Sequence, residues 1–195
     1  LAAHELARTQ AMVLSRRQIY GLGITRWEVR GQVRARRWRL IGDQSVCLHN
    51  GPMTDDSHRW AAVFQGGPSA CLDGASALVA SGLQRFDVAR HRVSVPRGAR
   101  VRRTRLYDIR QTRRLRPEDR ASTGIPRTRA PVAAVRAGLW AATDKQAAYV
   151  VTLAVQQGLA SPEQIGRALL AVRRDKRRQL LHELVNDLVD GARAL

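Results

Sequence analysis

Hydrophobic residues near the start of the chain recur at helical spacing behind two strong helix-start signals. Residues 15–18 (Ser-Arg-Arg-Gln) and 25–28 (Thr-Arg-Trp-Glu) both fit the capping box, in which a hydroxyl and a later acid or amide satisfy the first free backbone N–H groups. Two caps ten residues apart leave room only for a short helix, a turn at residues 21–23 (Gly-Leu-Gly) and a second helix. This outline is that of a helix-turn-helix.

A further helix and a β-hairpin are predicted on either side of this pair. Residues 1–12 have the apolar spacing of a helix, and alternation predicts two strands, over residues 36–41 and 45–48, joined by a glycine turn. Three helices followed by a hairpin predict an N-terminal winged helix-turn-helix over residues 1–50, which closes at Asn50-Gly51-Pro52.

The pattern over residues 54–195 predicts a mixed α/β domain that ends in a helical bundle. The predicted fold class of the whole chain is therefore α+β. Alternation predicts strands at residues 91–95 and 99–106. Helical spacing and start signals predict helices at about residues 54–64, 74–81, 130–142, 144–157, 162–172 and 175–189.

The chain is strongly basic, with 34 Lys and Arg against 16 Asp and Glu and a formal net charge of +18. Only Lys145 and Lys176 are lysines; codon bias in a GC-rich genome would account for much of this preference for arginine, although not for the net charge. The excess is spread along the chain and favours a polyanionic partner. Residues 98–100 and 110–116 form a basic stretch that is either solvated or in contact with DNA. A membrane is the weaker alternative, because no basic amphipathic helix and no apolar run of about 20 residues is present.

The second capped helix carries the strongest candidate for binding. At about 100° per residue, Trp27, Arg30 and Arg34 point away from its apolar stripe, and Arg26 lies at the edge of that stripe. Such positions in a helix-turn-helix reach base edges in the major groove, where arginine bonds guanine bidentately. A solvated face on an ordinary helical bundle is the alternative. Trp27 either wedges against a sugar or base or packs on the preceding helix or the wing, and packing is the favoured interpretation.

Neighbouring arginines are candidates for phosphate contacts. Arg36, Arg37 and Arg39 of the hairpin suit phosphate or minor-groove contacts from a wing. Arg16 and Arg17 begin the first capped helix and are phosphate candidates as well, with a solvated first turn as the alternative. The predicted DNA-binding set is therefore Arg16, Arg17, Arg26, Trp27, Arg30, Arg34, Arg36, Arg37 and Arg39.

Searches for catalytic chemistry find no supported site. The five histidines have no ligand spacing, no carboxylate pair lies in a metal motif, and neither a phosphate-binding glycine loop nor a nucleophile elbow is present. Cys47 and Cys71 are too few and too far apart for a metal knuckle or a disulfide framework, so we expect two buried thiols in a reducing compartment. The expectation is a cytoplasmic protein that is not an enzyme, with no catalytic residue, metal or cofactor.

Short strings along most of the chain carry a resemblance to a known family. The N-terminal strings are Leu14-Ser15-Arg16-Arg17-Gln18, Gly23-Ile24-Thr25-Arg26 and Arg37-Trp38-Arg39-Leu40-Ile41-Gly42. The later ones are Trp60-Ala61-Ala62-Val63, Ala75-Ser76-Ala77-Leu78, Val93-Ser94-Val95-Pro96 and Gly124-Ile125-Pro126-Arg127-Thr128. In these strings the chain resembles the AbiEi-type antitoxins of type IV toxin–antitoxin systems.

The resemblance implies a winged-helix domain that represses its own operon and a C-terminal α/β region that neutralises a nucleotidyltransferase-like toxin. It makes double-stranded operator DNA and that toxin the expected partners, with a homodimer on the DNA also considered and no membrane. The chain departs from the family pattern after Thr128, where residues 130–134 (Ala-Pro-Val-Ala-Ala) replace a more usual Thr-Pro-Ala-Arg-Thr run.

Two other interpretations stay open. Many similar actinobacterial chains carry a Vsr-like endonuclease domain after the helices, and this chain runs only from Leu1 to Leu195, so it is alternatively the DNA-targeting or regulatory part of a longer nuclease-family protein. RNA binding is the third interpretation, and the aromatic stacking platform typical of it is missing.

Overall fold

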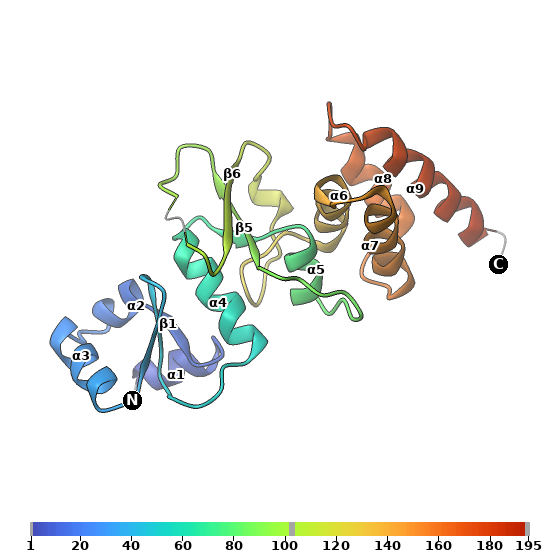
Figure 1. Cartoon of the computed structure of the whole chain (residues 1–195). Coiled ribbons are helices and arrows are strands. Elements are labelled where there is room, and N and C mark those ends of the chain that lie inside the picture. The colour runs from blue at the N-terminus through green and yellow to red at the C-terminus, as the bar shows by residue number, and fades with distance from the viewer. Residues whose placement is uncertain (1, 102–103, 194–195) are drawn as a thin grey trace. The chain divides into compact units, whose positions relative to one another are not determined.

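The computed structural model describes residues 2–101 and 104–193, and its fold is α+β, as predicted (Figure 1). The chain divides into two compact units. The first unit comprises Leu1–Cys71 and Val93–Leu115, and the second comprises Leu72–Arg92 and Arg116–Leu195. The domain boundary predicted between residues 50 and 54 falls within the first unit and stays a prediction.

The first unit begins with a series of short helices and strands, and the capping boxes predict two of the helices. In chain order these are α1 (Ala2–Arg8), β1 (Val13–Ser15), α2 (Arg16–Gly21), α3 (Arg26–Arg34), β2 (Arg39–Ile41), β3 (Ser45–Cys47) and α4 (Asp55–Gly66). Both predicted capping boxes are formed, at the starts of α2 and α3. Of the two glycines in the turn between them, only Gly23 has a positive φ, of 81°, so it alone requires the freedom of glycine.

A three-stranded antiparallel sheet in the order β1-β3-β2 packs against α1 and α2 through β1. The central strand β3 is buried along its whole length, and Val46 pairs with Leu14 on one side and with Leu40 on the other. Strand β1 is missing from the sequence prediction, because three residues are too few to show an alternation. It forms because the free edge of β3 offers backbone hydrogen-bond partners.

The core of this region joins α1, α2, α3 and the sheet. Its buried members are Ala3, Ala7, Leu14, Ile19, Val29, Val46 and Leu48, and Leu6, Met12, Ile24, Val33 and Trp38 pack against it half-buried. Helix α4 packs on β1 and β3. Because side chains alternate between the two faces of a strand, the position of Leu40 on β2 shares a face with Leu14 and Val46, whereas Arg39 lies on the other face.

Two strand predictions need correction. Strand β2 begins at Arg39 and not at Arg36, whose φ of 54° belongs to a turn rather than to a strand. The strand predicted at residues 99–106 is absent from its described positions 99–101 and 104–106, whereas Arg102 and Arg103 lie outside the described residues. After β5 (Arg92–Pro96), Gly98 turns the chain with a φ of 88°, and pairing resumes only at β6 (Asp108–Thr112).

A second sheet has the order β4-β5-β6, with β4 at Cys71–Leu72. The division between the two units crosses β4 and passes through the start of β5, so that Val93 to Pro96 and all of β6 belong to the first unit. Gly66, at the end of α4, lies against this sheet: a Cβ there would stand 2.9 Å from Val93 Cγ1. The glycine therefore lets α4 approach β5 closely.

The second unit is mostly helical, as predicted. Its elements are α5 (Ala75–Ala80), the short 3-10 helix η1 (Pro117–Asp119), α6 (Ala130–Trp140), α7 (Asp144–Gln156), α8 (Pro162–Leu170) and α9 (Arg178–Arg193). Helix α6 packs on α5, α7, α8 and α9 and is the centre of the bundle. At Gly138 a Cβ would stand 2.8 Å from Leu181 Cδ2, so α9 can pack closely on α6 only without a side chain there.

A buried ion-pair cluster connects α6 to Asp73, which directly follows β4, and to Asp119 of η1. Arg136 donates from Nη1 to Asp73 Oδ2 at 2.9 Å and from Nη2 to Asp119 Oδ2 at 3.0 Å. Asp73 is fully buried, and its other oxygen accepts from the Thr128 hydroxyl at 3.0 Å and from the Gly74 N–H at 2.8 Å. A buried carboxylate needs this full set of partners, so the cluster is structural.

Two further expectations concern the cysteines and the membrane. Cys47 and Cys71 are both buried thiols, as predicted, and burial raises the pKa of the Cys47 thiol above its ordinary value. Within residues 2–101 and 104–193, no helix combines the length and the apolar character that crossing a membrane requires.

Candidate nucleic-acid interface

The start of α3 is fixed by reciprocal hydrogen bonds. The Thr25 backbone N–H and hydroxyl both donate to Glu28 Oε2 at 2.7 Å, and the Glu28 N–H donates to Thr25 Oγ1 at 3.2 Å. The backbone N–H of Thr25, followed by its hydroxyl, lowers the pKa of the Glu28 carboxyl. The acid nearest the helix arginines is thus occupied by the cap.

Helix α3 and its neighbours enclose a basic hollow of about 280 Å³, which we call the arginine groove. Arg26, Arg30 and Arg34 lie at every fourth position of α3 and therefore on one side of it. Arg16 joins them from α2. The complete lining is Arg16, Tyr20, Arg26, Val29, Arg30, Val33, Arg34 and Leu40.

The floor of the arginine groove is the outer edge of the hydrophobic core. Val29 is buried and Val33 half-buried, and both pack in the cluster beneath the helix. Leu40 lies at the edge strand of the sheet and is 44% exposed. The floor is therefore held by the core, and the helix that bears the arginines cannot move without disturbing that packing.

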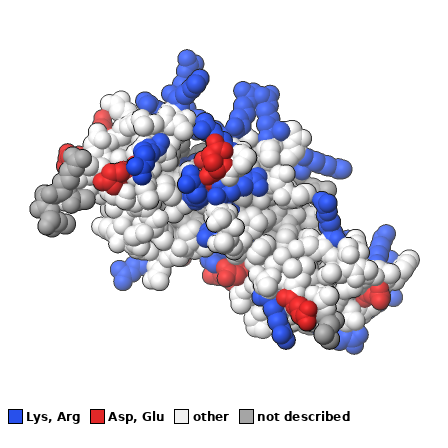
Figure 2. Space-filling model, turned by 180° about the vertical axis from the view of Figure 1, so that it is seen from behind, with Lys and Arg blue, Asp and Glu red and all other residues white. Residues whose placement is uncertain are grey.

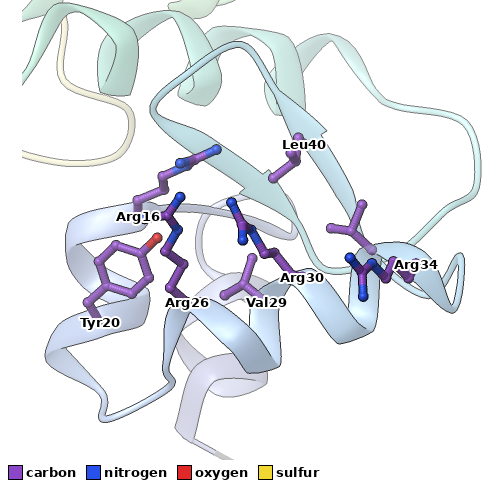
Figure 3. A pocket seen from close by; sticks show the side chains of 8 residues that line it. Arg16, Tyr20, Arg26, Val29, Arg30, Arg34 and Leu40 are labelled. Carbon is purple, nitrogen blue, oxygen red and sulfur yellow. The ribbon is translucent and has the colours of Figure 1, made fainter.

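The rim of the groove brings basic groups together. Figure 3 shows the side chains of Arg16, Arg26 and Arg30 pointing into the same space, with the Tyr20 hydroxyl beside them, whereas Arg34 lies toward the other end of the helix. Among the described residues, the side chains of these four arginines have no hydrogen-bond or ion-pair partner, although Nε of Arg16 is buried. The groove thus offers several guanidinium donors that no protein acceptor satisfies.

The electrostatics of the groove follow from its lining. Four arginines line it and no acidic residue does. Like charges held together in a partly enclosed space repel one another and raise the local potential, which attracts an anion. Figure 2 shows how basic side chains exceed acidic ones on the face that it draws. The groove gathers four basic side chains of the first unit in one place.

Trp27 and Arg17 lie outside the groove. Trp27 is 73% exposed, so the favoured interpretation that it packs on the preceding helix or the wing is wrong: nothing in the described fold covers it. Its ring has the Arg30 guanidinium carbon 5.1 Å from the centroid, a cation–π distance. Arg17 is exposed on α2. Both remain candidates for contacts beyond the groove.

The three hairpin arginines are not brought to the groove. Arg36 and Arg37 lie in the turn after α3, and Arg37 Nε donates to Gln32 Oε1 at 2.6 Å. Arg39 donates from Nη2 to the Asn50 carbonyl at 2.8 Å, on the opposite face of the sheet from Leu40. Their predicted role as a shared clamp therefore has less geometric support than the stripe on α3.

Two groove residues escaped the sequence analysis. Tyr20 is 42% exposed and lies in the rim. Its spacing of four from Arg16 places both side chains on one face of α2, a signal that was open to use. Leu40 could not be found in this way, because its position at the groove depends on the pairing of β2 with β3.

A search for metal chemistry covers the described part of the chain. There, no three His, Cys, Asp or Glu side chains are grouped so that they could hold a metal ion. The charged groups that line the arginine groove are all guanidinium donors, which suits an anionic ligand.

Comparison with known proteins adds no family to these observations. No family model matches the chain, and no curated protein matches it. The resemblance to AbiEi-type antitoxins therefore stays a prediction, and the geometry of the groove is the basis for the function.

Proposed function

We propose that the arginine groove binds double-stranded DNA and that the protein is a sequence-specific transcriptional repressor. The observation that carries the proposal is the convergence of Arg16, Arg26 and Arg30, without an acidic neighbour in the lining, beside the second helix of a capped pair. Duplex DNA presents a dense row of phosphates that would neutralise these charges and release bound counterions.

The order of elements supports a particular docking. The succession α1-β1-α2-α3-β2-β3, with its antiparallel sheet, matches that of a winged helix-turn-helix. In this class the second helix of the pair enters the major groove. In the proposed complex Arg30 and Arg34 face base edges, while Arg16 and Arg26 hold a phosphate together with the Tyr20 hydroxyl.

The other predicted arginines take peripheral places in this complex. Arg17 is exposed on α2 and Arg36 is exposed in the turn after α3. Both would contact phosphates at the edges of the site. A homodimer on DNA is part of the proposal, and a two-fold symmetric binding sequence with half-sites about 10 bp apart, or a multiple of that, would be its signature.

The antitoxin role rests on the sequence resemblance alone. On that basis we propose that the protein is cytoplasmic and also counteracts a nucleotidyltransferase-like toxin encoded in the same operon. Growth of cells that express such a neighbouring toxin, with and without this chain, tests it directly: rescue supports the role. Failure of rescue by a chain that still binds DNA favours the alternative of a DNA-targeting part of a nuclease-family protein.

The DNA-binding proposal is tested with a charge-matched pair of double variants. R26A/R30A removes two groove arginines, whereas R167A/R173A removes two exposed arginines of the second unit. Duplexes selected by the protein from a random-sequence pool serve as probes in gel shifts. We expect R26A/R30A to abolish the specific shift, since it removes a base contact of Arg30, worth about 1–3 kcal/mol, together with the phosphate contact of Arg26. The control variant should bind within about threefold of the unsubstituted protein, as expected for charges that take no part in the proposed contacts.

Folding is checked on the same samples by circular dichroism and thermal unfolding. The substituted arginines are exposed, so both variants should unfold like the original protein. Unchanged gel shifts for folded R26A/R30A would contradict the assignment of the groove.

A further inference from the structure

The connection between β5 and β6 is a second basic feature of the first unit. Residues 93–115 contain eight arginines and a single acid, Asp108. Six of these arginines lie outside positions 102 and 103, and we define the β5–β6 loop as the described residues 97–101 and 104–107. Its described arginines, Arg97, Arg100 and Arg105, are all exposed.

The base of this loop is held in place. The Arg97 N–H donates to the Thr112 carbonyl at 3.1 Å, and Gln111 Nε2 donates to the Ala99 carbonyl at 2.7 Å. At its other end Tyr107 is 5% exposed, and its burial raises the pKa of the phenol to about 12. The loop is thus anchored in the unit at both ends.

The loop adjoins the hairpin that borders the arginine groove. A Cβ at Gly42, in the turn between β2 and β3, would stand 4.0 Å from Leu106 Cδ1, and Leu106 follows directly after Arg105. Both belong to the first unit, so their proximity is a property of one compact body. The C-terminal end of the basic loop therefore lies next to the tip of the hairpin.

The loop arginines are uncommitted, unlike a neighbour on β6. Arg110 Nε donates to Asp108 Oδ1 at 2.6 Å and is thereby partly neutralised. The side chains of Arg97, Arg100 and Arg105 have no hydrogen-bond or ion-pair partner in the part of the chain that the structure describes. Holding three such charges on one loop is unfavourable without an external anion.

We propose that the β5–β6 loop is a second DNA-contacting element, which grips phosphates that flank the segment bound by the arginine groove. The proposal rests on the proposed function and extends its footprint. Phosphates suit the loop better than an acidic protein does, because protein–protein interfaces have an apolar centre and protein–DNA interfaces are polar and positively charged. Of the described loop residues, Leu106 is the exposed large hydrophobic one.

The test compares two triple variants in the full chain. R97Q/R100Q/R105Q alters the loop, and R90Q/R167Q/R173Q removes as many exposed charges from the second unit. The probe is a mixed-sequence duplex of about 30 bp, on which salt-dependent binding reports phosphate contacts. For the loop variant, we expect the slope of log affinity against log salt to fall by about 0.9 for each phosphate that the protein no longer neutralises, or about 2.7 for three phosphates. The control variant should keep the original slope.

A hydroxyl-radical footprint on the selected duplex gives an independent readout. The loop variant should leave an edge of the footprint unprotected and retain protection at the centre. Equal slopes and footprints for the two triple variants would overturn the loop proposal and leave the groove assignment standing. Absence of DNA binding by the unsubstituted protein would instead overturn both.

Discussion

The two compact units carry the same basic residue type and use it in opposite ways. The first unit holds 18 arginines and 6 acidic residues, a net charge of +12, and the second holds 16 Lys and Arg and 10 acidic residues, a net charge of +6. The arginines of the groove and of the β5–β6 loop point outward without a protein acceptor. Several arginines of the second unit are instead consumed by its own structure.

Arg136 and Arg177 illustrate the second use. Arg136 lies in the buried cluster with two carboxylates. Arg177 donates to Asp144 Oδ1 at 2.8 Å and to the Ala141 carbonyl at 2.6 Å, and so satisfies the end of α6. Arg92 lies 3.8 Å from the ring centroid of Trp140. Net charge alone therefore does not single out the proposed binding site, whereas the gathering of uncommitted arginines in one hollow does.

The largest expected effect concerns stability in the second unit. Arg136→Met leaves Asp73 buried without its cation, and we expect the free energy of unfolding to fall by about 3–5 kcal/mol, the usual cost of breaking a buried pair. Chemical denaturation followed by circular dichroism measures it. The double variant D73N/R136M should lose less than the sum of the single losses. A loss below about 1 kcal/mol for Arg136→Met would mean that this arginine is no more structural than a surface one.

An intermediate effect is expected at matched helix caps. Thr25→Ala and Ser161→Ala each remove a side chain that accepts a hydrogen bond at the start of a helix, from Glu28 N–H in α3 and from Gln164 N–H in α8. Each should cost about 1 kcal/mol of stability. Only Thr25→Ala should also weaken DNA binding, because only α3 carries the groove arginines. Equal DNA affinities for the two folded variants would break the distinction between the units.

A smaller and opposite effect is expected in the groove. R26A/R30A should change the free energy of unfolding by no more than about 0.5 kcal/mol, because exposed side chains without partners contribute little. At low salt the change should be a stabilisation, since two like charges have left a crowded rim, and it should vanish as salt screens the remainder. Thermal unfolding across a salt series measures it. A large destabilisation would show that these arginines serve the fold.

The smallest effect is a pH dependence of the α3 cap. Because the pKa of Glu28 is lowered in the folded chain, its contribution is fully present above the ordinary pKa of a glutamate, about 4.3, and is lost as the pH falls through the lowered value. Glu28→Gln keeps the capping box without a titrating group. Below that pH, the free energy of unfolding of the original protein should therefore fall relative to that of Glu28→Gln. Urea denaturation of both proteins at several pH values measures this difference. An unchanged difference would remove Glu28 from the cap's energetics.

Local signals predicted the helices well, and pairing across the chain limited the rest. The caps at Ser15 and Thr25 involve only residues three positions apart, so the sequence alone identified them. Strand β1 and the entry of Leu40 into the groove depend on which strands meet β3. The alternation after Gly98 predicted a strand, but its described residues, 99–101 and 104–106, form no strand.

The candidate site follows the same rule. The helical spacing of Arg26, Arg30 and Arg34 was visible in the sequence. It placed Arg30 and Arg34 on the outer face of the helix and Arg26 only at the edge of the apolar stripe. The convergence of Arg16 with Arg26 requires the fold, because α2 and α3 meet only after the turn at Gly23 is made. The exposure of Trp27 was missed because an aromatic side chain is usually covered, and here no element lies opposite it.

Replacing single guanines by 7-deazaguanine in the selected duplex tests the proposed contact of α3 with base edges most directly. This change deletes the N7 acceptor in the major groove and leaves base pairing intact. At one or more guanines, we predict that the affinity of the original protein falls about tenfold, or about 1.4 kcal/mol, while the affinity of Arg30→Ala or Arg34→Ala no longer responds. Full affinity of the original protein at every substituted guanine would contradict recognition of guanine by the arginine groove.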